Sequence, residues 1–265
     1  MSLKILSQDL RVIRTTGEMT LRQAAVSPFI IFTVLVQPLL VAMLALWMLA
    51  DKKTNDGIYV VVGTGMSGLW SSLLFICGNS ITVERWTGTL EALVATPANI
   101  SVIVFGKNLA NVLQSLASMV VCYLVAALLF NYQITVDQPL LFIISLLLTV
   151  IAFVSFGLIL GPLFLLSPAV QNFQNGIEFP IYILAGFLFP IALLPNWTTP
   201  LSYLLAPYWA ARALHVASSV GGTFSEIAFC WAMLILFSVI YLVGSRYLFR
   251  AVMYRVRVDA TLGLE

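Results

Sequence analysis

The residues that could carry out catalysis are few in this sequence and are not grouped. His215 is the single histidine, and no arrangement of Ser, Asp or Cys typical of a catalytic site accompanies it. The cysteines Cys77, Cys122 and Cys230 lie within apolar runs, where they are expected to be small packing residues. The sequence therefore predicts no catalytic residue, no metal site and no enzymatic activity of this chain's own.

A nucleotide-binding loop is also missing from the sequence. Gly106-Lys107 is the only Gly-Lys pair, Asn108 follows it, and no glycine lies five residues before Gly106. We therefore expect this chain to bind no cofactor and to take any energy from a partner chain. The net charge of +2 is small and dispersed, which argues against a nucleic-acid partner.

Residues 84–97 form a polar segment with a helical pattern. Its apolar residues recur at i, i+4, i+7 and i+8: Trp86, Leu90, Leu93 and Val94. Its opposite face is polar: Glu84, Thr87 and Glu91. This pattern predicts one short amphipathic helix, which Pro97 ends. Such a helix can dock in a cleft of a soluble partner or lie at the membrane surface, and the pattern alone favours neither.

The composition is typical of a membrane protein. Of the 265 residues, 61% are hydrophobic and 9% are charged, whereas a soluble domain has about 25% charged residues. The mean hydropathy is +1.02. So few charges cannot cover a water-facing surface, and the chain is long enough for several spans of about 20 residues.

Gaps between charged residues predict an all-α membrane protein, a single domain of residues 1–265 with six transmembrane helices. We place the spans at residues 27–50, 57–83, 109–130, 139–166, 177–194 and 226–249. The first contains Pro38, which predicts a kink. Spans four and five share a long apolar region whose only charge is Glu178, and we divide it at the polar, proline-containing stretch 167–176.

Residues 1–22 are expected to form an amphipathic N-terminal helix rather than a signal peptide, since they lack a compact apolar core with a cleavage site. Leu3, Leu6, Leu10 and Ile13 recur at helical spacing, which suits a helix in the headgroup plane or one packed on a soluble partner. With six spans, ten of the thirteen basic residues fall on the side of the N-terminus. This distribution predicts that both termini are cytoplasmic.

Residues 195–222 are too apolar for an ordinary aqueous loop and too interrupted by proline to span. We expect short re-entrant or interfacial helices there, which would form an outer lid over a central path. Their aromatic residues could line that path or form an interface belt: Trp197, Tyr203, Tyr208 and Trp209.

Glu178 is the one carboxylate expected near the inner end of span five. At mid-membrane it would cost about 2.5–3.5 kcal/mol, judged by the insertion-scale value for Asp. We therefore expect its side chain either to reach the cytoplasmic interface or to line a polar translocation path.

Two motifs resemble those of a known family. Residues 84–97 contain Glu-x-x-x-Gly-Thr-Leu-Glu-x-Leu with a proline after it. Further along come Ala185-Gly186, Phe189-Pro190-Ile191-Ala192-Leu193-Leu194-Pro195-Asn196-Trp197 and Pro207-Tyr208. With the spans and the N-terminal helix in the same order, the chain resembles ABC-2 type permeases, the membrane subunits of a class of ABC exporters.

The resemblance implies a permease subunit of an ATP-driven exporter in a bacterial or archaeal cell membrane. Two copies of a separate ABC ATPase would bind ATP and Mg, and a second permease protomer, identical or paralogous, would complete the path within the lipid. The resemblance assigns these residues to ATPase coupling: Glu84, Arg85, Trp86, Gly88, Thr89, Leu90, Glu91 and Leu93. It assigns these to the outer lid or path: Phe189, Pro190, Pro195, Trp197 and Tyr208.

Relatives of this kind export drugs, antibiotics, peptides, or lipid-linked and polysaccharide material, and the short outer loops suit export. If the assignment holds, Glu91→Lys should uncouple ATP hydrolysis from transport while the protein still inserts. The alternative function is a membrane anchor, immunity or sensing protein that docks an ATPase without transporting anything.

Overall fold

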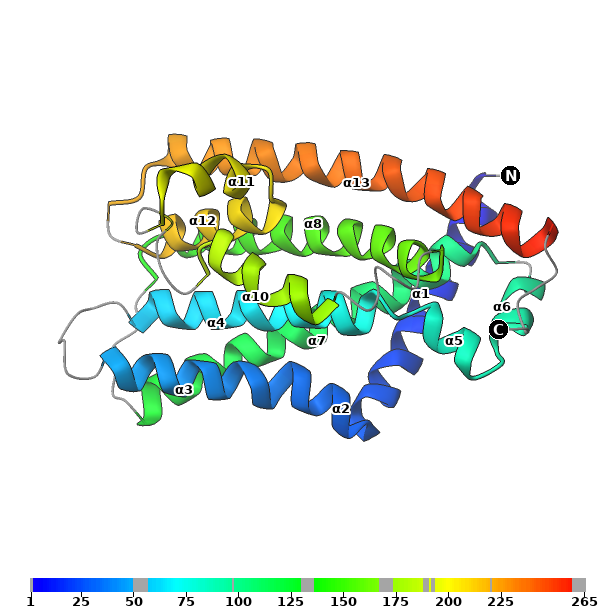
Figure 1. The fold of residues 1–265 in the computed structure, drawn as a ribbon, viewed down its shortest axis with the longest axis horizontal. Coiled ribbons are helices and arrows are strands. Elements are labelled where there is room, and N and C mark those ends of the chain that lie inside the picture. Colours follow the sequence, from blue (N-terminus) through cyan, green and yellow to red (C-terminus); the bar gives the residue numbers. More distant parts are fainter. Residues whose placement is uncertain are drawn as a thin grey trace.

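The computed structural model describes residues 2–49, 57–96, 98–129, 136–166, 174–187, 191, 194–219 and 221–258. Every regular element in these ranges is a helix, and the longest helices run side by side along the molecule (Figure 1). Their apolar composition makes the chain a multi-pass, all-α membrane protein, as the sequence predicts.

Four described segments are long and apolar enough to cross a membrane: Ile58–Trp86, Ile100–Leu128, Pro139–Leu166 and Phe224–Val252. The first combines α4 (Gly57–Ser72), a π-helical stretch (Leu73–Cys77) and α5 (Thr82–Trp86). The others belong to α7 (Ile100–Leu129), α8 (Pro139–Leu166) and α13 (Phe224–Val258). They correspond to the predicted spans two, three, four and six, although α7 begins earlier and α13 continues further than expected.

The predicted first span consists of α2 (Pro28–Ile31), a π-helical stretch (Phe32–Val36) and α3 (Gln37–Leu49). The π-helical stretch ends two residues before Pro38, whose ring disfavours a regular α-helical turn before it. The segment Pro28–Leu44 and the preceding helix meet at 87°. The described part thus holds four candidate spans, or five if this bent pair counts as one, and the total of six stays a prediction.

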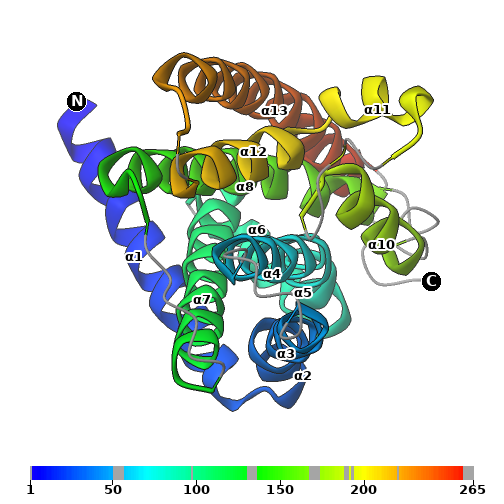
Figure 2. The same cartoon turned by 90° about the vertical axis from the view of Figure 1, so that its left-hand side faces the viewer.

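The N-terminal helix α1 (Ser2–Val26) lies across the bundle, as Figure 2 shows, where α3 and α4 are seen end-on and α1 is extended. It packs against α7 at Gly106. A Cβ atom on Gly106 would lie 2.9 Å from the Ile13 carbonyl oxygen and would also collide with Thr16 Oγ1. The glycine therefore lets α1 cross α7 closely, while the placement of α1 in the headgroup plane stays a prediction.

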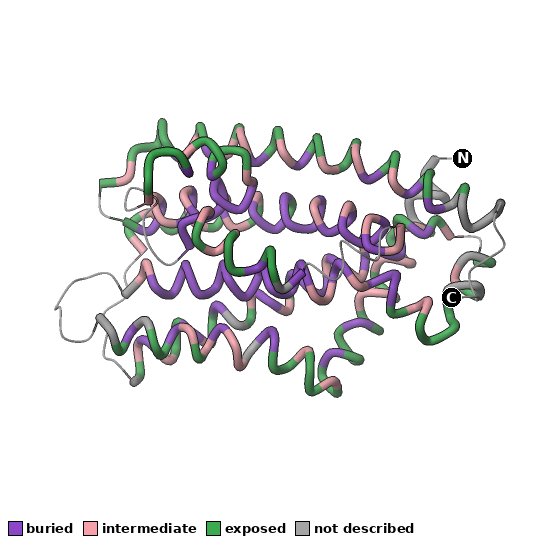
Figure 3. Tube along the Cα trace, in the orientation of Figure 1, coloured by how far each residue is buried: buried purple, intermediate pink, exposed green. Residues whose placement is uncertain are grey.

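Helix α4 lies at the centre of the bundle and is buried along nearly its whole length (Figure 3). It contacts α3, α7 and α12 (Ala206–Ser218), and its continuation packs on α8. Leu69 and Leu73 are fully buried, and Trp70 stacks on Phe156 with ring centroids 5.8 Å apart. Contacts on all sides explain why the described residues of α4 include none that is exposed to the surroundings.

The fifth predicted span appears as a shorter helix, α10 (Gln174–Leu184). Gly186, with φ of +67°, lies in the turn that follows it, where a left-handed conformation favours glycine. At 1.5 Å per residue the eleven residues of α10 extend roughly 16 Å, about half of the hydrocarbon thickness. Residues 167–173 and 188–190, on either side, lie outside the described residues.

The segment expected to form an outer lid contains short helices: a 3-10 turn (Asn196–Thr198), α11 (Thr199–Tyr203) and α12 (Ala206–Ser218). Helix α12 is largely buried and packs against α4, α8 and α13. The Gln138 side-chain amide donates a hydrogen bond to the Gly222 carbonyl (2.9 Å), which joins the start of α8 to the loop after α12.

The two ends of the bundle carry different elements (Figure 1). Helices α1, α5 and α6 (Leu90–Ala95) gather with the last turns of α13 at one end, while α11 and α12 lie towards the other. The prediction from the basic residues likewise places the N-terminus, residues 84–97 and the C-terminus on one side, here called the inner end. The other end is called the outer end.

Candidate functional site

Residues 84–97 contain two short helices joined by a tight turn, so the prediction of a single helix is wrong. Gly88, between α5 and α6, has φ of +71°. Its amide donates to the Arg85 carbonyl (3.2 Å), and the Thr89 amide donates to the Glu84 carbonyl (2.9 Å). These two bonds form a Schellman motif, which ends α5 and redirects the chain. The apolar residues of this segment keep helical spacing on both sides of Gly88, but the left-handed conformation of this glycine interrupts the helix.

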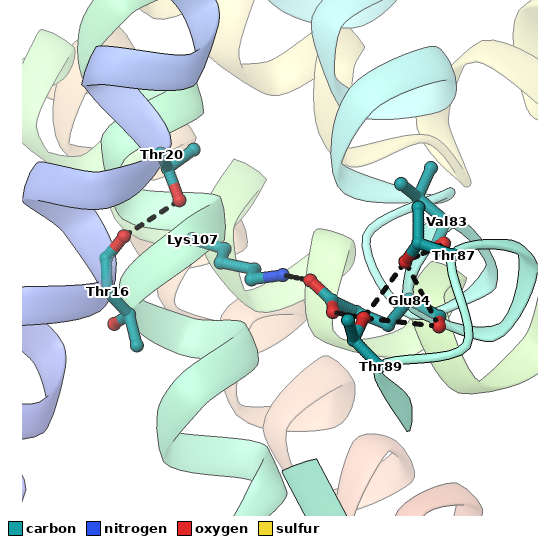
Figure 4. A network of polar contacts seen from close by, with 7 residues as sticks. All are labelled: Thr16, Thr20, Val83, Glu84, Thr87, Thr89 and Lys107. Carbon is teal, nitrogen blue, oxygen red and sulfur yellow. Dashed lines mark hydrogen bonds and ion pairs between the residues drawn. The ribbon is translucent and has the colours of Figure 1, made fainter. Parts of the chain in front are cut away.

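The Glu84 side chain connects this turn to α7 (Figure 4). Its Oε1 accepts a hydrogen bond from Lys107 Nζ on α7, and its Oε2 accepts one from Thr89 Oγ1. The side chains of Lys107 and Glu84 are 17% and 21% exposed, so water shields their attraction only partly. The Thr87 hydroxyl lies 2.9 Å from the Thr89 hydroxyl and also donates to the Val83 carbonyl. The turn and α7 are therefore held together by one shielded ion pair.

Lys107 is the residue of this site that sequence reasoning missed. The sequence places Lys107 with the basic residues of the inner side. Glu84 lies 23 positions earlier, a separation at which neither helical nor turn spacing predicts a contact. The signal available was a basic residue within a long apolar run, which needs a counter-charge when it is partly buried.

The apolar side chains of this segment point in different directions. On α5, Trp86 is 71% exposed and Val83 is 45% exposed, so this helix presents an apolar face to its surroundings. Leu93 on α6 instead packs against a buried cluster that includes Ile100 and Phe249. The structure therefore separates a surface that can contact a partner from a side chain that anchors α6 to the bundle.

The remaining residues assigned to coupling are placed less completely. Arg85 is half-buried and takes part in neither of the two ion pairs found among the described residues. Leu90 and Glu91 lie on α6, but their side chains are outside the described residues. Their predicted roles, and the expected effect of Glu91→Lys, stay predictions.

A second carboxylate, Glu178 on α10, is buried between helices and is 4% exposed. Its Oε1 accepts hydrogen bonds from Ser71 Oγ (2.5 Å), Tyr182 OH (2.7 Å) and Gln37 Nε2 (3.2 Å). These donors come from α4, α10 and α3, and none of them carries a charge. Neither of the ion pairs among the described residues includes Glu178. Internal hydrogen bonds thus stabilise this carboxylate. Because the side chain is buried, the expectation that it reaches the cytoplasmic interface is wrong, while its role in a translocation path stays a prediction.

The residues assigned to the outer lid do not form one surface. Trp197 is 72% exposed and Pro195 is exposed, whereas Tyr208 is buried and lines a cavity of about 420 Å³. Phe189 and Pro190 lie outside the described residues. The structure therefore brings Tyr208 and Asn196 to a common cavity, but leaves Trp197 pointing away from the protein core.

The two other aromatic residues of this segment join α11 to α12. Trp209 Nε1 donates a hydrogen bond to the Tyr203 carbonyl (2.9 Å), and their rings stack with centroids 5.6 Å apart. Trp209 is 4% exposed and also makes an edge contact with Phe229 on α13. Trp209 is thus a packing residue within this chain, while Tyr203 stays 44% exposed beside the cavity.

Arg212 and His215 on α12 also line the outer cavity. The His215 ring stacks on Tyr59 with centroids 3.7 Å apart. Burial lowers the pKa of His215 to about 3, so its imidazole is neutral at physiological pH. Arg212 Nη1 donates a hydrogen bond to Tyr208 OH (3.1 Å). Among the described residues of the cavity wall, Arg212 is the charged one.

Metal binding finds no support within the part of the chain that the structure describes. No group of three or more His, Cys, Asp or Glu side chains there could hold a metal ion. Cys77, Cys122 and Cys230 are each buried in the helical bundle, where they act as packing residues.

Together the fold and the site define a helical membrane domain with a structured turn at its inner end. A sequence model of the ABC-2 type transporter family matches residues 13–219. The chain belongs to the ABC-2 type transporter family. It is also similar to ABC transporter G family member 20 of Dictyostelium discoideum, with 28% identity over 150 residues. That match covers 56% of this chain and 20% of the relative, so the chain spans about a fifth of the relative's length.

Proposed function

We propose that this chain is the permease subunit of an ATP-driven exporter, coupled to separate ABC ATPase subunits and paired with a second permease protomer. The observation that carries the proposal is the α5–α6 turn, in which an exposed apolar helix is tied to a membrane-crossing helix through Glu84 and Lys107. Family membership supports the transport role, and the name of the Dictyostelium relative is that of an ABC transporter.

The geometry of the turn supports a role in force transmission. Trp86 can insert into an apolar cleft of a partner, while Leu93 and the ion pair hold the same segment to the bundle. A displacement of the docked α5 would therefore be transmitted to α7. The dense packing of α4 between α7 and α12 would carry it further through the bundle.

Copurification tests the ATPase contact. The chain is co-expressed with candidate ABC ATPase subunits from its own source, solubilised and captured by an affinity tag. Trp86→Ala should reduce the ATPase retained by about tenfold, since a buried interface tryptophan typically contributes more than 1 kcal/mol. Trp47→Ala is the matched control, because Trp47 is 74% exposed on α3 and should not touch the ATPase.

Vesicles then test transport. Inside-out vesicles that contain the complex are given a fluorescent dye, a labelled peptide and a labelled lipid, each with ATP or with a non-hydrolysable analogue. ATP-dependent accumulation of one probe supports export. Failure of any ATPase to copurify contradicts the proposal, and ATPase binding without movement of any probe favours the membrane-anchor alternative.

A further inference from the structure

The outer end of the molecule contains a cavity of about 420 Å³, in the size range of sites for small organic molecules. Its wall comes from distant parts of the chain: Tyr59 on α4, Gly186 after α10, Asn196, and Tyr203, Arg212 and His215 from the helices that follow. All of these lining residues belong to one chain.

The charge in this cavity is unbalanced. Among the described residues that line it, Arg212 is the one that carries a charge, and His215 adds no second charge because its imidazole is neutral. Of the five N–H groups that a guanidinium offers, one donates to Tyr208 OH. Arg212 takes part in neither ion pair found among the described residues. The negative charge of Glu226 acts on Arg212 electrostatically, but the two side chains form no ion pair. A half-buried cation with donors to spare favours an anion beside it.

The rest of the wall is aromatic and apolar. Tyr59 and His215 form a flat stacked pair, and Tyr203 presents a half-exposed ring. Ile191 and Leu194 add aliphatic surface. Such a wall suits the body of an organic molecule, whereas hydrated inorganic ions gain little from aromatic faces.

We propose that this cavity is a binding site for an organic anion, in which a carboxylate or phosphate pairs with Arg212 and an aromatic or aliphatic body lies against Tyr59 and Tyr203. The same chemistry could come from a soluble compound or from the headgroup region of an anionic lipid. The site does not rest on ATP-driven export, because binding at the cavity requires neither an ATPase nor a second protomer.

Binding is tested on the purified full chain in nanodiscs of phosphatidylcholine. The probes are naphthalene carboxylate and its uncharged isostere naphthalene carboxamide, titrated by calorimetry. The carboxylate should bind about tenfold more tightly than the carboxamide, as expected for a charge-assisted hydrogen bond to a guanidinium. Arg212→Gln should abolish this preference, and Arg246→Gln, which removes an exposed positive charge from α13, should keep it.

A second variant keeps the test sound if Arg212→Gln fails to fold. Asn196→Asp is isosteric, lies in the exposed part of the cavity wall and places a competing carboxylate there, so it should also weaken carboxylate binding about tenfold.

Nanodiscs with phosphatidylglycerol identify the source: lost naphthalene carboxylate binding assigns the site to a lipid headgroup, and retained binding assigns it to a soluble anion. Equal affinity for the two probes, or a preference that survives both variants, overturns the proposal.

Discussion

The two carboxylates Glu84 and Glu178 are held in opposite ways. Glu84 lies at the inner end, is partly exposed, and pairs with the cation Lys107 on another helix. Glu178 is buried in the bundle and accepts three hydrogen bonds from neutral groups. One is part of a link between a surface turn and a span, and the other is part of a rigid contact among three helices.

The difference shows what each site can do. An ion pair with partial water access can open at modest cost, since water replaces the lost partner. A buried carboxylate has no such replacement, and loss of its acceptor leaves donors unsatisfied. We therefore expect removal of the Glu178 acceptor to alter stability most, and changes around Glu84 to alter the turn and its attachment.

The largest effect is expected for Glu178→Leu. The change removes the acceptor of three hydrogen bonds, and at about 0.6 kcal/mol for each bond within a membrane protein the loss is about 2 kcal/mol. This loss of stability is measured by thermal unfolding in detergent, monitored as the disappearance of the monodisperse peak in size-exclusion chromatography. Glu226→Leu removes an exposed carboxylate from α13 and should change stability by less than about 0.5 kcal/mol. Equal stability of the two variants would show that the Glu178 bonds contribute little.

Gly88→Ala should have the next largest effect, and it acts on the turn alone. A Cβ at Gly88 meets no atom within 4 Å, so the cost of about 1 kcal/mol arises from the left-handed backbone. Hydrogen exchange should rise at the amides of the Schellman turn and not in α4. Gly176→Ala is the matched control, because its Cβ also meets nothing while its backbone is helical. A slower exchange in Gly88→Ala would contradict this account of the turn.

The sequence predicted the large features of the fold because long apolar runs and charge gaps record burial in lipid. Helices α4, α7, α8 and α13 follow from such runs directly. The break at Gly88 was missed because apolar residues on either side happened to keep helical spacing. The left-handed conformation of one glycine depends on the Schellman bonds, which no periodicity reveals.

The partners of the two carboxylates could not be predicted for a different reason. Gln37 lies 141 residues from Glu178, and Lys107 lies 23 residues from Glu84. Such pairs depend on how helices pack, and helix packing has no signature in local spacing. Glu84 itself was found because it belongs to a recognisable motif, while the outer cavity around Arg212 assembles from segments that show no joint pattern.

A smaller effect is expected from Glu84→Gln. The ion pair with Lys107 is partly exposed, so its loss should cost about 0.5–1 kcal/mol. Lys107→Gln should cost a similar amount, and the double variant should cost little more than either single change, because the two act through the same contact. A double-mutant cycle measured by thermal unfolding gives the coupling energy directly. Fully additive losses would mean that the two side chains stabilise the protein independently.

Glu178→Gln should have the smallest effect and distinguishes the shape of the acceptor from its charge. Glutamine keeps an oxygen where Ser71, Tyr182 and Gln37 donate, so the three hydrogen bonds can persist. The bonds weaken when the acceptor is neutral, but the cost of burying a charge disappears, and these two changes nearly cancel. The expected change in unfolding free energy is below about 0.5 kcal/mol, measured beside Glu178→Leu in the same detergent. If glutamine is as harmful as leucine, an oxygen at this position is not enough, and the three hydrogen bonds require the carboxyl group itself.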